Sequence, residues 1–160
     1  MTNKKFKNKH IVSAILSILN VAVIAFIFVH SLSPAVESAE ESGEVLGLLN
    51  YIFPFELSQH IVRKLAHFVE FSGLGFITSL TVYSFTKKYF GGIFLKLFLC
   101  LATAVADESI QLCVEGRSGQ ITDVLLDFSG CIFGILLSLL IILIFNGIRK
   151  GNKNGKHQGK

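Results

Sequence analysis

The feature that most constrains this chain is a series of apolar runs, each close to the length that crosses a lipid bilayer. The first extends from Ile11 to Val29, and three more follow after residue 60. A transmembrane helix needs about 20 predominantly apolar residues. The composition, 51% hydrophobic with a mean hydropathy of +0.60, is typical of membrane proteins rather than of soluble domains. We therefore predict an all-α integral membrane protein with four transmembrane helices in a compact bundle.

The positions of these runs divide the chain into segments. The run that starts at Ile11 is longer than the apolar part of a cleaved signal peptide, about 7 to 15 residues, so we predict that it is retained. The predicted segments are a basic N-terminus (1–10), a first transmembrane helix (11–30), an external loop with an interfacial segment (31–60), a three-helix transmembrane region (61–146) and a basic disordered tail (147–160).

The segment between the first two spans is predicted to be a loop. Its first part, 31–44, is rich in Ser and Glu and contains Pro34, which favours a solvated loop. Its second part, 45–57, is apolar and aromatic around Pro54, which is typical of a segment lying at the membrane interface. An ordinary packed loop remains an equal alternative for this second part.

Helix boundaries in the 61–146 region are indicated by capping residues and a turn. Ser58 and Thr122 are predicted N-caps of the second and fourth spans. The stretch 86–92 is predicted to be a tight basic turn between the second and third spans. Lys96, near the start of the third span, is predicted to extend its ammonium group to water.

The distribution of basic residues predicts the orientation. If the N-terminus is cytoplasmic, only Arg63, Lys64 and Arg117 lie on the outside, and such an imbalance favours both termini inside. The basic residues do not form the contiguous face that a nucleic-acid binder needs, so we predict no nucleic-acid partner. Those predicted inside are Lys4, Lys5, Lys7, Lys9, Lys87, Lys88, Arg149, Lys150, Lys153, Lys156 and Lys160.

Polar residues intrude into the last three spans, all near the predicted outer surface. A charged side chain at mid-span costs about 2.5 to 3.5 kcal/mol, so these residues must face one another or a wet cavity. Carboxylates outnumber bases there, so the cluster must hold protons, charge His67 or bind a cation. The predicted site residues are Arg63, Lys64, His67, Glu70, Asp107, Glu108, Gln111, Arg117, Asp123 and Asp127. Gly130 and Gly134 give the fourth span a face for close helix packing.

Three interpretations of this cluster stay open. In the first, the polar residues hold the helices together, as interhelical glue. In the second, they form a binding site in which Arg63 or Arg117 holds a phosphate or carboxylate while acidic groups hold an amine. In the third, they form an enzyme site. In the enzyme case, Glu108 is a general base, or a divalent metal bound by the cluster activates water. The candidate metal ligands are His67, Glu70, Asp107 and Asp127, an oxygen-rich set that suits Mg²⁺ or Ca²⁺ better than Zn²⁺.

Three motifs in these spans resemble the VanZ-like family of small bacterial membrane proteins. They are Arg63-Lys64-Leu-Ala-His67-Phe-Val-Glu70, Asp107-Glu108-Ser-Ile-Gln111, and Gly116-Arg117-Ser-Gly-Gln-Ile-Thr-Asp123-Val-Leu-Leu-Asp127-Phe-Ser-Gly130. The resemblance covers about residues 60 to 135 and leaves the first span outside. It implies a helical membrane domain at the bacterial plasma membrane, as part of the cell envelope, and the family is named after a protein linked to teicoplanin resistance. We therefore expect membrane lipids as partners, together with a lipid-linked cell-wall component or a glycopeptide, or a metal-dependent hydrolase or transferase acting on such a lipid.

Overall fold

Every regular secondary-structure element in the part that the structure describes is a helix. The computed structural model describes the backbone of residues 2–52 and 58–155, with side chains except at 2–9, 35–39, 41, 49, 52 and 149–155. The prediction of an all-α fold is confirmed. The helices are α1 (Thr2–Ser31), α2 (Ala35–Ile52), α3 (Gln59–Thr86), α4 (Ile93–Gln111) and α5 (Ile121–Gly155).

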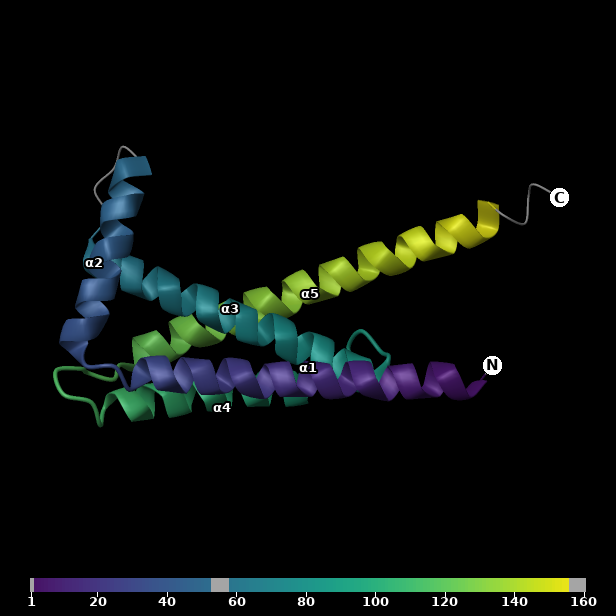
Figure 1. Ribbon diagram of the computed structural model, residues 1–160, viewed down its shortest axis with the longest axis horizontal. Helices are drawn as coiled ribbons and strands as arrows, with labels where there is room; N and C mark the ends of the chain where they lie inside the picture. The colour runs from purple at the N-terminus through teal and green to yellow at the C-terminus, as the bar shows by residue number, and fades with distance from the viewer. Residues whose placement is uncertain (1, 53–57, 156–160) are drawn as a thin grey trace.

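The long helices run back and forth between two ends of the molecule. α1 and α4 lie side by side and run in one direction, whereas α3 and α5 run in the other (Figure 1). The start of α1 and the end of α5 are therefore at the same end. The opposite end, which we call the polar end, gathers the end of α1, the start of α3, the end of α4 and the start of α5. Here α2 stands across the other helices. At the other end of the molecule, the C-terminal part of α5 diverges from α1 and extends beyond α3, so the predicted compactness does not extend to these two segments (Figure 1).

Three helices of the described chain are long and apolar enough to cross a membrane. The candidate spans are His10–Ser31, Gln59–Thr86 and Ile121–Ile148, and they correspond to the predicted first, second and fourth spans. α4 is 19 residues long but carries Lys96, Asp107 and Glu108. These charges make α4 too polar to qualify as a span by composition, so the predicted count of four is not confirmed.

The seam between α3 and α5 is close because glycines line it. A Cβ added at Gly130 would lie 2.6 Å from the carbonyl oxygen of Phe68, and one at Gly134 would overlap that of Ser72. Gly75 on α3 approaches α5 equally closely, at the backbone of Cys131. The predicted packing role of Gly130 and Gly134 agrees with these contacts, because small residues let helix backbones approach. The seam brings the start of α3 against the start of α5.

The loop predicted for 31–44 is wrong in its main part, because α2 begins at Ala35. Ala, Glu and Leu are strong helix formers, and they dominate this segment despite its polar character. Pro34, which suggested a loop, directly precedes the helix, where its fixed backbone angle suits a first turn. α2 continues to Ile52 through much of the predicted interfacial segment, and residues 53–57 lie outside the described part.

The tail predicted to be disordered is helical as far as Gly155, and residues 156–160 lie outside the described part. The apolar run ends near Phe145 and is followed by Asn146 and Gly147, residue types common at helix ends, yet α5 continues past them. The end of a membrane span and the end of a helix are therefore different positions in this chain.

Three local predictions have mixed outcomes. Ser58 is the N-cap of α3, and its hydroxyl accepts from the amide of Ile61 at 3.4 Å. Thr122 is not an N-cap, since α5 begins at Ile121 and the amides of residues 123 and 124 bond to the carbonyl of Gln120. The predicted turn at 86–92 is present, with left-handed backbone at Lys87 and Gly92.

Lys96 does not extend to water. Its side chain is fully buried, and its ammonium group donates to the carbonyl of Tyr89 at 3.3 Å. The carbonyl of Tyr89 belongs to the turn before α4, so the side chain of Lys96 folds back over the start of that helix. A lysine near a helix start can reach such a carbonyl as easily as solvent, and the sequence does not distinguish the two.

Candidate functional site

Most of the predicted site residues surround one cavity at the polar end. Its volume is about 50 Å³, enough for one or two water molecules or a small polar group. Glu70 and Asp107 lie beside this cavity rather than in its wall. The predicted residues that line it are Arg63, Lys64, His67, Glu108, Gln111, Arg117, Asp123 and Asp127.

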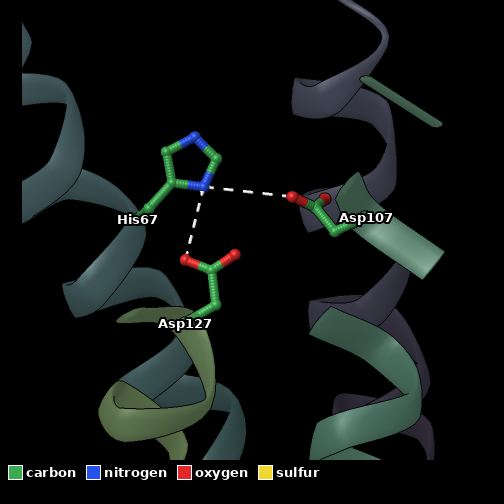
Figure 2. A group of neighbouring side chains, drawn as sticks. All are labelled: His67, Asp107 and Asp127. Atoms are coloured by element: carbon green, nitrogen blue, oxygen red, sulfur yellow. Dashed lines mark ion pairs between the residues drawn. The ribbon is translucent and has the colours of Figure 1, made fainter. Parts of the chain in front are cut away.

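Three side chains from three helices converge beside this cavity, and two of them, His67 and Asp127, line it. His67 on α3 points between Asp107 on α4 and Asp127 on α5 (Figure 2). The His67 Nδ1 atom lies 3.9 Å from the Asp107 Oδ2 atom and 3.8 Å from the Asp127 Oδ1 atom. Both distances exceed a normal hydrogen bond, about 2.7 to 3.2 Å, so neither pair is in direct contact. Both aspartates are completely buried.

Asp107 is held in place by two neighbours. The hydroxyl of Ser31, at the end of α1, donates to Asp107 Oδ1, and Gln111 Nε2 donates to Oδ2 at 2.9 Å. Gln111 is one turn further along α4, which is the spacing that places two side chains on the same helix face. These bonds fix the direction of the Asp107 carboxylate toward His67.

Asp127 differs from Asp107 in having no such support. Neither of its carboxylate oxygens has a hydrogen-bond partner among the described residues. A buried carboxylate without hydrogen bonds is energetically costly, and buried charges in proteins are usually paired or bound to metals. The α3–α5 seam explains its position, since Asp127 lies one turn before Gly130 and faces the turn that carries His67.

Other predicted residues form ordinary partnerships. Lys64 Nζ and Asp123 Oδ1 form an ion pair of 2.7 Å between α3 and α5. Glu108 Oε2 accepts from the backbone amide of Gln120 at 2.9 Å, which places a carboxylate at the N-terminus of α5. That position is favourable because the helix dipole and unbonded amides attract negative charge. Part of the polar set therefore acts as interhelical glue.

Two residues of α1 belong to the site although the sequence reasoning gave them no role. His30 Nδ1 lies 3.0 Å from Glu70 Oε1, its ring stacks on that of His67 at 6.2 Å, and Ser31 binds Asp107. Both residues follow the first apolar run directly. Their depth is the signal that could have found them, because the end of the first span lies at the same level as the other polar residues.

A second, larger cavity adjoins the polar one. It is an open groove of about 420 Å³ between α2, α3 and the end of α1, and its walls are mainly apolar. Arg63 and His67 line both spaces. The other residues of the groove are His30, Ser42, Val45, Val62, Leu65, Ala66, Val69 and Glu70. The two spaces form a polar compartment and an apolar compartment with a shared wall.

Comparison with known proteins adds the family. The family model described as VanZ/LLP1 matches residues 16–144. The chain belongs to this family. No curated protein and no solved structure matches it.

The VanZ/LLP1 region extends further than the three sequence motifs indicated. It begins within α1, so the prediction that the first span lies outside the family region is wrong. All ten predicted site residues and the two α1 residues that contact them fall within the matched range. Membership of the family and the apolar helices together identify a VanZ-like membrane protein.

Proposed function

We propose that this VanZ/LLP1 protein crosses the bacterial plasma membrane four times, with both termini in the cytoplasm. Three charged residues keep α4 from qualifying as a membrane span by composition: Lys96, Asp107 and Glu108. All three are buried in the protein. α4 thus presents few charges to lipid although its sequence is not uniformly apolar. The start of α1 and the end of α5 lie at the same end of the molecule (Figure 1), which agrees with the basic residues predicted there to be inside. The polar end then faces outward.

The function that this geometry supports best is the binding or shielding of a lipid-linked cell-wall component or a glycopeptide at the outer leaflet. One observation carries the proposal: a polar cavity and an apolar groove share the side chains of Arg63 and His67. A ligand that fills both spaces must have a polar headgroup joined to an apolar chain. Lipid-linked wall components have this construction.

The side chains around the cavity suit an anionic headgroup. Arg63 and Arg117 reach it from α3 and from the turn before α5, and guanidinium groups bind phosphate and carboxylate in a bidentate manner. The apolar chain would lie along α3, against Val62 and Val69. The groove has a volume of about 420 Å³, which accommodates one hydrocarbon segment rather than a complete lipid.

The proposal is tested by measuring the binding of a short-chain polyprenyl pyrophosphate to the full chain in detergent. Arg63→Gln removes a headgroup contact, and Ala66→Phe fills part of the groove, so each is expected to weaken binding at least tenfold. The matched control is Ala102→Phe, at an exposed alanine on α4 outside both cavities. Equal affinities for the wild-type protein and both site variants would overturn the proposal.

The proposed role toward a glycopeptide antibiotic is tested by a measurement in cells. If the protein shields a glycopeptide target, deletion of its gene raises teicoplanin susceptibility, and Arg117→Ala reproduces that change at equal protein abundance. Susceptibility that is the same in wild type, deletion strain and variant would remove the antibiotic link. The lipid-binding proposal would then stand on the binding measurement alone.

A metal-dependent hydrolase or transferase acting on an envelope lipid is the second candidate function. The observation that favours it is the convergence of His67, Asp107 and Asp127 beside the headgroup cavity. Turnover of a polyprenyl pyrophosphate, lost in Asp107→Ala and Asp127→Ala, is the expected result for an enzyme. Binding without turnover, in the presence of divalent metal, would assign the protein to the binding class.

A further inference from the structure

We propose that His67, Asp107 and Asp127 form the protein ligands of one divalent metal ion. Each residue offers one donor atom, and the three donor atoms lie within 4.8 Å of one another. They come from α3, α4 and α5, so the site exists only when these helices are assembled. The carboxylates and the histidine Nδ1 face the same space (Figure 2).

The spacing is close to what an ion requires. Metal–ligand bonds of about 2.1 Å at tetrahedral angles place two ligand atoms about 3.4 Å apart. The Nδ1 atom of His67 is 3.9 and 3.8 Å from the facing oxygens of Asp107 and Asp127. A contraction of a few tenths of an ångström would bring the histidine nitrogen and each facing oxygen to that separation, whereas a hydrogen bond between them would need a larger contraction.

The charge of the group favours an ion over a simple salt bridge. A protonated His67 between two carboxylates leaves a net charge of −1 in a buried place, which is unfavourable in a low dielectric. A divalent ion with neutral histidine and the same carboxylates gives a net charge of zero. Metal ligation also explains why the buried oxygens of Asp127 have no hydrogen-bond partner among the described residues.

The surroundings resemble the support that metal ligands usually have. Ser31 and Gln111 hydrogen-bond to Asp107 and orient its carboxylate, as outer residues do at metal sites. Glu70, which the sequence suggested as a fourth ligand, is not in the converging group, since its Oε1 atom pairs with His30 at 3.0 Å. The ligand set is thus one nitrogen and two carboxylates, a donor set that suits Mn²⁺ or Zn²⁺ better than Ca²⁺.

Three protein ligands leave positions on the ion open. His67 and Asp127 also line the polar cavity of about 50 Å³, so these positions face a space that holds water or an anionic oxygen. Arg63 and Arg117 lie in the same wall and would meet the other oxygens of a phosphate or carboxylate. The metal site itself does not depend on the proposed lipid function, because it follows from the three side chains alone.

The experiment measures metal binding to the purified full chain in detergent, after chelation and without added lipid. Titration with Mn²⁺ is expected to show one saturable site per chain. Asp127→Asn and His67→Gln are each expected to weaken that site at least tenfold. Glu115→Gln, at an exposed carboxylate in the turn before α5, is the matched control and is expected to bind as wild type does.

Two results would overturn the proposal: no saturable binding in the wild-type protein, or undiminished binding in Asp127→Asn. Helix content by circular dichroism shows whether each variant is folded. If a variant does not fold, pulsed electron paramagnetic resonance of Mn²⁺ on the wild-type protein decides, and absence of a histidine nitrogen coupling overturns the site. Because lipid is absent, a failure of metal binding is separate from a failure of lipid binding.

Discussion

Two polar groups lie near the same cavity, the Lys64–Asp123 pair and the His67–Asp107–Asp127 cluster. They differ in how a carboxylate between helices is partnered. Both place carboxylates between α3 and its neighbours near the polar end. The pair is partly exposed and in direct contact at 2.7 Å, with exposed side-chain fractions of 33% and 22%. In the cluster both aspartates are buried, each lies nearly 4 Å from His67, and Asp127 has no hydrogen bond within the described chain.

The difference teaches how a polar residue in a membrane helix is to be interpreted. A carboxylate matched to one cation at short distance is explained by helix association, and it needs no ligand. A buried carboxylate that lies near other potential metal ligands, without a hydrogen bond to them, is explained by an ion that binds between them. The variants below, ordered from the largest expected effect to the smallest, break or sharpen this comparison.

The largest effect is expected where both groups lose their common support. Gly134→Ala places a methyl group against the backbone of Ser72 across the α3–α5 seam, and no side-chain rotation relieves that overlap. We expect the free energy of unfolding to fall by about 3 kcal/mol or more. Thermal or denaturant unfolding in detergent measures it.

Gly147→Ala is the control on the same helix, because a Cβ there meets nothing within 4 Å. It is expected to leave stability unchanged or raise it slightly, since alanine favours a helix by about 1 kcal/mol over glycine. Similar losses in both variants would contradict the close seam.

Asp127→Asn separates a binding cluster from a salt bridge. In metal-free protein we expect the free energy of unfolding to rise, or to fall by less than about 1 kcal/mol, because this carboxylate makes no hydrogen bond to lose and its burial is costly. If His67 and Asp127 were instead a buried ion pair, removal of one partner would cost about 3 to 5 kcal/mol. Denaturant unfolding after chelation decides between these values.

The smallest effect is expected at the exposed pair. Lys64→Gln and Asp123→Asn should each lower stability modestly, and a double-mutant cycle should give a coupling of about 0.2 to 1 kcal/mol that decreases with salt. A coupling above about 3 kcal/mol would mean that this pair is as critical as a buried one, and the contrast with the cluster would disappear.

Much of the site could be predicted because ionisable residues in apolar helices are costly and must converge. The residues His67, Asp107 and Asp127 were found in this way, and periodicity placed them on the correct helix faces. His30 and Ser31 were given no role, because a residue at the end of a span can reach water and needs no partner; only their depth, level with the other polar residues, marked them. Glu70 was assigned to the metal candidates on its spacing, yet its partner came from α1.

The sequence by itself determined that the chain is helical, belongs in a membrane, and carries more acid than base near one end of its spans. Composition and period suffice for these conclusions, because they depend on lengths and on transfer free energies of single residues. Only the tertiary structure decided which carboxylates are matched and which are not. Pairing depends on distances of a few ångströms between separate helices, and these are set by how closely Gly75, Gly130 and Gly134 let α3 and α5 approach.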